Sequence, residues 1–166
     1  MIIIFNTNND ITIKNKLKIF LLFVSIVFIT YLLNINNAKS NLNYYNNFNN
    51  FHVLKQIIIK NTICFIWILS GILIGKLMVY TYILSNGIIL GLLISKFKNI
   101  KYFLLIIPHG ITEIFAFLFT CSIVLSILQN NEFNKKYLKS ISFAYIIILI
   151  SAIIEAFITP LFIKFI

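Results

Sequence analysis

Acidic side chains are scarce in this chain, and two of them lie within long apolar runs. The 166 residues include only four carboxylate side chains, namely Asp10, Glu113, Glu132 and Glu155. Glu113 belongs to an apolar run over residues 102–128, and Glu155 belongs to one over residues 141–165. A carboxylate near the centre of a bilayer costs about 2.5–3.5 kcal/mol on insertion scales, so an acid placed there marks a candidate functional site.

His109 adds a titratable ring beside Glu113. The local sequence is Pro108-His109-Gly110-Ile111-Thr112-Glu113. Residues four apart share one face of a helix, so the ring and the carboxylate can meet. Proline lacks an N–H and clashes with the carbonyl four residues before it, so we expect a helix break at Pro108–Gly110. The crossing helix would then run over residues 108–128, with a carboxylate favoured near its N-terminal dipole.

Three interpretations fit His109, Glu113 and Glu155, with Asn86 and Thr112 as further polar members of the intramembrane cluster. In the first interpretation, these residues form a buried polar cluster that specifies how the helices pair, with each contact worth about 0.6 kcal/mol. Alternatively, they line a path for an ion, a proton or a peptide. The third interpretation is a metal or catalytic site, but His109 and Glu113 supply only two ligands from one helix turn. We therefore expect no enzyme activity, no metal and no cofactor.

The composition assigns the chain to a class of proteins. Hydrophobic residues make up 60% and charged residues 11%, whereas soluble domains have about 45–50% and 25%. We expect an all-α, multi-pass helical bundle in the bacterial cytoplasmic membrane, with the lipid bilayer as its first partner. All fourteen basic residues are lysines and they are dispersed. A nucleic-acid-binding protein would need a basic face, so nucleic acid is not an expected partner.

Apolar runs of bilayer length predict one integral membrane domain over residues 1–166. We expect spans near residues 17–33, 57–75, 77–95, 108–128 and 141–163, and a loop over residues 34–56. Ala38 and Ser40 leave open a cleavable signal peptide in place of the first span. The lysine counts of the two sides are tied, so we place the N-terminus inside because the first helix usually sets the orientation.

Two pairs of glycines have the spacing of helix-packing motifs. Gly71 and Gly75 end the second predicted span, and Gly87 and Gly91 lie within the third. Small residues four apart let helix backbones approach closely in membranes. We expect all four glycines to lie at helix contacts.

Three short motifs occur in a fixed order along the chain. They are Ser85-Asn86-Gly87-Ile-Ile-Leu-Gly91, then Ile107-Pro108-His109-Gly110-Ile-Thr-Glu113, then Ala152-Ile-Ile-Glu155-Ala156-Phe157-Ile158-Thr159-Pro160. This series resembles the stage II sporulation protein M family over roughly residues 55–160. The resemblance implies a small protein of about five spans that is a non-enzymatic subunit of a larger membrane assembly.

Two roles follow from that resemblance. The first is an accessory subunit of an export or immunity complex, such as one for circular-bacteriocin secretion, maturation or self-protection. Its expected partners are an ABC-type ATPase or a peptide exporter, and a homo-oligomer is compatible with it. The alternative is a sporulation engulfment subunit that acts with peptidoglycan-remodelling partners. The short N-terminal region and the Pro-His-Gly-x-x-Glu element favour the first role.

Overall fold

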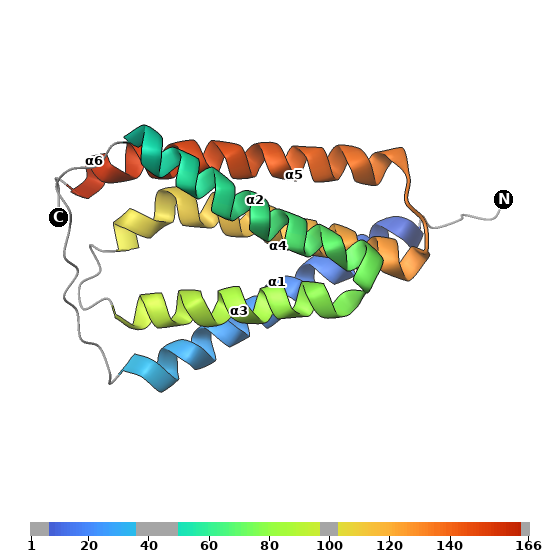
Figure 1. Ribbon diagram of the computed structural model, residues 1–166. Helices are drawn as coiled ribbons and strands as arrows, with labels where there is room; N and C mark the ends of the chain where they lie inside the picture. The colour runs from blue at the N-terminus through green and yellow to red at the C-terminus, as the bar shows by residue number, and fades with distance from the viewer. Residues whose placement is uncertain (1–6, 36–49, 97–102, 164–166) are drawn as a thin grey trace.

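The computed structural model describes residues 7–35, 50–96 and 103–163, and these are helical apart from short turns. Figure 1 shows long helices that run alternately in opposite directions, so that the start of α1 and the end of α6 lie at opposite ends of the bundle. The elements in chain order are α1 (Thr7–Asn34), α2 (Asn50–Ile74), α3 (Lys76–Ser95), α4 (Phe103–Asn130), α5 (Lys135–Ile153), the π-helical turn η3 (Ile154–Ile158) and α6 (Thr159–Ile163).

Five stretches of these helices are long and apolar enough to cross a membrane. The fifth stretch runs from Lys135 to Leu161, so α5, η3 and most of α6 form one crossing. The all-α membrane-bundle prediction is therefore confirmed. The helices begin earlier than the predicted first and second spans, because α1 starts at Thr7 and not at residue 17, and α2 starts at Asn50 and not at residue 57. Residues 50–56 of the predicted loop over 34–56 therefore belong to α2. Residues 36–49 lie outside the described ranges.

Short turns join α2 to α3 and α4 to α5. Gly75 alone separates α2 from α3, with a φ of 112° that side chains rarely adopt. Asn131 ends α4 in a left-handed conformation at φ 52°. The side chain of Asn134 then accepts hydrogen bonds from the backbone N–H groups of Lys136 and Tyr137, which caps the start of α5. These turns make helices that are adjacent in sequence antiparallel.

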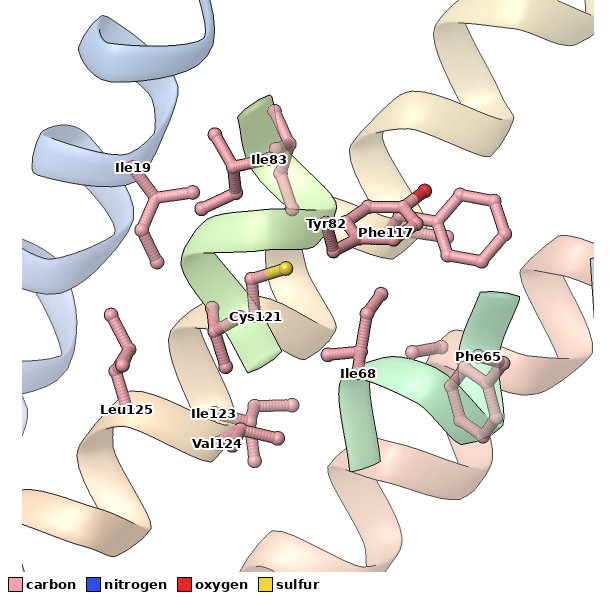
Figure 2. Packing of buried hydrophobic residues seen from close by; sticks show 14 of the residues in the cluster. Ile19, Phe65, Ile68, Tyr82, Ile83, Phe117, Cys121, Ile123, Val124 and Leu125 are labelled. Carbon is pink, nitrogen blue, oxygen red and sulfur yellow. The ribbon is translucent and has the colours of Figure 1, made fainter. Parts of the chain in front are cut away.

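The central helix of the bundle is α4, which packs against α1, α2, α3, α5 and the last turns of the chain. Figure 2 shows part of its buried face, including Phe117, Cys121 and Val124, beside residues from α1, α2 and α3. Thr120 and Ser126 are buried on the same helix and donate to carbonyls one turn earlier, at 2.8 Å each. Those bonds satisfy the hydroxyls, so a fully packed helix can hold small polar residues that let its neighbours approach.

Glycines bring α3 close to α1. A Cβ atom on Gly91 would lie 2.6 Å from Thr30 Cβ and 2.7 Å from the Val27 carbonyl oxygen, and one on Gly87 would lie 2.8 Å from Ile26. No side chain larger than hydrogen fits there without a shift of α1. The two helices are therefore in close contact at Gly87 and Gly91, and we call this contact the α1–α3 seam.

The glycines of α2 differ from that pattern. A Cβ atom on Gly71 would lie 3.1 Å from Val124 of α4, so this glycine does face a neighbouring helix. A Cβ atom on Gly75 would have nothing within 4 Å, and the backbone there is in the left-handed region. The expectation of a helix contact at Gly75 is therefore wrong, because the residue forms the turn between α2 and α3.

A buried amide ties α1 to the far end of α4. Asn15 is only 6% exposed, and its Nδ2 donates to Ser126 Oγ at 3.1 Å and to Gln129 Oε1 at 2.8 Å. Lys16, the next residue, places its ammonium group 4.9 Å from the centre of the Phe119 ring. Asn15 and Lys16, the polar residues just before the predicted first span, are therefore part of the packed bundle.

The predicted break at Pro108–Gly110 is also corrected, because α4 is continuous from Phe103 through these residues. Proline removes one backbone hydrogen bond, the one to the carbonyl of Leu104. That carbonyl lies in the first turn of α4, so the helix loses a single bond near its start. Membrane helices tolerate such a loss where neighbouring helices cover the site.

Candidate functional site

A polar cavity lies inside the bundle, toward the end that holds the N-terminus of α2. Its volume is about 270 Å³, and α1, α2, α3, α4 and η3 all contribute to its wall. Tyr82 and Phe117, whose rings are 5.3 Å apart at their centres, connect this wall to the apolar core drawn in Figure 2. The charged and amide side chains of the wall are those of Lys60, Asn61, Asn86, Glu113 and Glu155.

Adjacent residues of α2 supply the hydrogen-bond donors. Lys60 is exposed at the mouth of the cavity, whereas Asn61 is only 7% exposed. The Asn61 side chain interacts electrostatically with the Glu113 carboxylate. Even so, its buried Nδ2 atom makes no hydrogen bond of ordinary geometry within the described part of the structure. A buried amide donor without a partner costs about 1–3 kcal/mol, so this atom calls for an acceptor in the cavity.

The two acids of the cavity come from other elements. Glu113 comes from α4 and Glu155 from η3, and both are half-buried. The two carboxyl groups influence each other electrostatically, and the ammonium group of Lys60 attracts Glu155. The cavity therefore presents two carboxyl groups and one amine to any molecule that enters it.

The position of Glu155 depends on a local change of helix type. The N–H of Thr159 donates to the carbonyl of Ile154, five residues back, as in a π-helix. The Thr159 hydroxyl donates to the same carbonyl at 3.4 Å. Pro160 follows and has no N–H to offer, so the usual α-helical ladder is interrupted at this point. Single π-turns of this kind are frequent at functional sites, and here one presents the Glu155 carboxylate to the cavity.

The other members of the predicted cluster lie at different distances from the cavity. Asn86 lines it, and its amide also donates to its own helix at the carbonyl of Tyr82, at 3.1 Å. Gly110 is buried and lines it too. Thr112 donates instead to Ser151 Oγ at 3.2 Å and so links α4 to α5. The backbone of His109 is helical, but its side chain lies outside the described part of the structure, so its predicted contact with Glu113 stays a prediction.

Sequence reasoning missed the α2 side of this cavity. Lys60 falls in the apolar run that starts at Ile57, and a lysine there can extend its side chain to the membrane surface, so its position alone does not identify it as a cavity residue. The signal that identifies it is the Lys60-Asn61 pair, a cation and an amide together inside a span. Among the residues with described side chains, no three His, Cys, Asp or Glu are grouped as metal ligands.

Comparison with known proteins gives one match. Residues 18–160 fit the family model described as Stage II sporulation protein M, and every residue that lines the cavity falls in this range. No curated protein and no solved structure matches the chain.

Proposed function

The chain belongs to the stage II sporulation protein M family, and from this premise we propose that it is a non-enzymatic accessory subunit of a membrane export or immunity complex. The specific case we favour is a complex for the secretion, maturation or self-protection of a circular bacteriocin. The subunit would reside in the cytoplasmic membrane of a bacterium. In this proposal, nucleotide hydrolysis or peptide movement belongs to partner proteins, such as an ABC-type ATPase or a peptide exporter.

The observation that carries this proposal is the charged cavity within an otherwise apolar bundle. Lys60, Glu113 and Glu155 lie on helices of bilayer length, where each ionised group is costly. Helix pairing alone could be specified by neutral amides at a lower cost. The presence of three ionisable groups around an accessible space supports a role in which the cavity binds a polar or cationic group of another molecule.

The outer surface of the bundle supports a role as a subunit. Only 17% of the first spanning stretch and 22% of the second are buried within this chain, compared with 61% of the stretch in α4. Large apolar side chains such as Leu73, Leu77 and Leu33 are strongly exposed. Such surfaces fit lipid, and they equally fit the helices of a neighbouring membrane protein.

A second candidate function is a subunit of the sporulation engulfment machinery with peptidoglycan-remodelling partners. The description of the matching family favours this candidate, because it is named for a sporulation protein. The two candidates share the fold and the cavity. They differ in the partner proteins that each requires.

An affinity pull-down distinguishes these candidates. The tagged full-length protein is expressed at native level in its host and recovered from membranes in mild detergent, and its partners are identified by mass spectrometry. A tagged multi-span protein of the same host, expressed at the same level, controls for nonspecific recovery. A second copy with a different tag reports self-association in the same experiment.

Enrichment of an ATP-binding-cassette ATPase, a peptide exporter or a peptide precursor is the expected result. Enrichment of cell-wall remodelling enzymes would overturn the export and immunity role in favour of engulfment. Recovery of neither class above the control would contradict both candidates.

A further inference from the structure

An apolar groove adjoins the polar cavity on the surface of the bundle. The groove has a volume of about 670 Å³ and lies between α1 and α4, with Leu17 and Phe20 on one side and Ile111 and Phe115 on the other. Two residues of α4, Ile114 and Leu118, line both the cavity and the groove. A molecule with a polar end and an apolar chain could therefore occupy both at once.

The cavity also lies at a suitable depth for a lipid headgroup that is drawn slightly into the protein. Lys55 and Gln56 are exposed and polar, and the apolar part of α2 starts directly after them. Lys60 follows Gln56 by four residues, which is about 6 Å along a helix. Phe51 of α2 contacts Phe157 of η3 with ring centres 5.6 Å apart, so Glu155 lies near the same polar end of the bundle.

Groups of both charge signs line this cavity. The α2 helix contributes the Lys60 ammonium group and the Asn61 amide, whose buried Nδ2 makes no hydrogen bond of ordinary geometry within the described residues. The α4 helix and η3 contribute the carboxyl groups of Glu113 and Glu155. The groups on α2 suit an anionic acceptor, and the carboxyl groups suit a cationic donor. A ligand that satisfies both sets has an anion and an ammonium group a few bonds apart.

We propose that the cavity binds the headgroup of an amine-bearing zwitterionic phospholipid, of which phosphatidylethanolamine is the common example. The phosphate accepts from Lys60 and Asn61, and the primary ammonium group donates to Glu113 and Glu155. An acyl chain lies in the apolar groove between α1 and α4. The cavity, far larger than the roughly 30 Å³ of one water molecule, has room for such a group. This inference rests on the proposed function in that it names a ligand for the same cavity, and it is tested on the purified protein without partners, so its failure is distinguishable from a failure of the pull-down.

The proposed site discriminates between headgroups. Phosphatidylcholine keeps both charges but has no N–H to donate, so it loses the hydrogen bonds to the carboxylates. Phosphatidylglycerol has the phosphate and no cation, so it leaves both carboxyl groups without a donor. One hydrogen bond to a charged group corresponds to about tenfold in affinity. Phosphatidylcholine loses the bonds to two carboxyl groups, so we expect a preference of about tenfold or more for the primary amine.

Native mass spectrometry of the full-length protein tests the proposal. The delipidated protein in mild detergent is titrated with equal mixtures of phosphatidylethanolamine and phosphatidylcholine that have identical acyl chains. The series of mono-, di- and trimethylated ethanolamine lipids is then compared on the wild-type protein alone. The expected result is a progressive loss of bound lipid as methyl groups replace the N–H groups, to about a tenth or less at the trimethylated form. Equal retention across the series would overturn the proposal without any variant.

Variants locate the site within the protein. Glu113→Gln should reduce the preference for phosphatidylethanolamine over phosphatidylcholine about tenfold, because it removes an acceptor of the ammonium group. Asn61→Leu should instead weaken the binding of both lipids about tenfold, because both carry the phosphate. Glu132→Gln removes an acid from an exposed turn outside the cavity and should change neither the preference nor the affinity. Helical content and elution as a single species show that each variant is folded. A preference that persists in Glu113→Gln, or a wild-type affinity in Asn61→Leu, would contradict the proposed site.

Two further ligands distinguish other occupants of the same cavity. Soluble O-phosphoethanolamine carries the headgroup without acyl chains, and we expect it to compete at least tenfold more weakly than the lipid because it leaves the groove empty. Competition of equal strength would overturn the lipid assignment. Binding of an apolar peptide with a free N-terminus that requires Glu113, without a headgroup preference among the lipids, would overturn it in favour of a peptide site.

Discussion

Ionisable side chains within the spanning helices, those of Lys60, Glu113 and Glu155, determine which groups the cavity can bind. Glu113 and Glu155 influence each other electrostatically, and Lys60 attracts Glu155. The cavity that holds them is open enough for another molecule to supply a donor to the carboxyl groups. The chemistry that we propose for the site is recognition of a cationic or zwitterionic group, and this proposal depends on the two carboxyl groups.

Replacing either carboxylate by its amide tests that dependence. We expect Glu113→Gln and Glu155→Gln to insert into the membrane at wild-type levels, because the amide has nearly the same shape and lower desolvation cost. Recovery of the partner complex should fall about tenfold, as expected for the loss of a charge-assisted hydrogen bond. The measurement is quantitative pull-down against membrane abundance in the native host. Glu132→Gln is the control, and wild-type recovery for both cavity variants would show that the carboxylates are not needed.

The sequence predicted one side of the cavity and missed the other, for a physical reason. Glu113, Glu155 and Asn86 could be predicted because carboxylates and amides stand out within apolar runs and belong to an ordered set of motifs. Lys60 could be assigned equally well to the membrane surface, because a lysine side chain is long enough to extend there from several residues inside. Only the packing of α2 beside α4 shows that Lys60 and Asn61 face the acids.

At the scale of the elements, close helix contacts hold the cavity in shape. The α1–α3 seam depends on Gly87 and Gly91, where a methyl group would overlap atoms of α1. The α1–α4 contact depends on the buried amide of Asn15. These two contacts fix α1 at either end, and between them α1 adds Phe23 to the cavity wall.

Gly91→Leu should separate α3 from α1. The new side chain meets the Val27 carbonyl oxygen and the Thr30 side chain, and backbone atoms cannot rotate away as a flexible side chain would. Overpacking of this kind typically costs about 1–3 kcal/mol. The measurement is the midpoint of detergent-induced loss of helicity. Ser85→Leu adds comparable bulk to an exposed position of the same helix, and equal stability of the two variants would contradict the close seam.

Asn15→Leu should loosen α1 from α4. The change removes two hydrogen bonds to Ser126 and Gln129, which are worth about 0.6 kcal/mol each on average in membrane bundles. We expect a loss of roughly 1 kcal/mol in the free energy of unfolding. Asn34→Leu is the matched control, because the Asn34 amide donates to Thr30 within α1. A greater loss in the control would argue against the contact between α1 and α4.

Element boundaries were predictable where hydropathy changes and unpredictable where backbone geometry decides. The Gly-x-x-x-Gly pattern is the same whether its second glycine packs against a helix or turns the chain, so Gly75 was misassigned. Proline in a helix can end it or merely remove one bond, and at Pro108 the helix continues. The π-turn before Pro160 has no periodicity signal of its own, because it adds a single residue to a helix that continues on both sides.

In the whole molecule, the other four crossings pack around helix α4, and the polar cavity lies toward one end of the bundle. Hydropathy alone identifies the five crossings. Their arrangement in space brings residues from α2, α3, α4 and η3 together, such as Lys60 and Glu155, which are 95 positions apart in the sequence. The central claim is therefore that α2 and η3 meet at the cavity.

Site-specific cross-linking in native membranes tests this claim most directly. In a background with Cys64→Ala and Cys121→Ala, the pair Lys60→Cys and Glu155→Cys is treated with a short thiol-to-thiol cross-linker, after a protease site has been inserted between α4 and α5. The control pair is Lys60→Cys with Glu132→Cys, because Glu132 follows α4 at the opposite end of the bundle. The account predicts that the first pair stays joined after proteolysis and the control pair does not. Failure of the first pair to cross-link, or equal cross-linking of both pairs, would contradict the cavity.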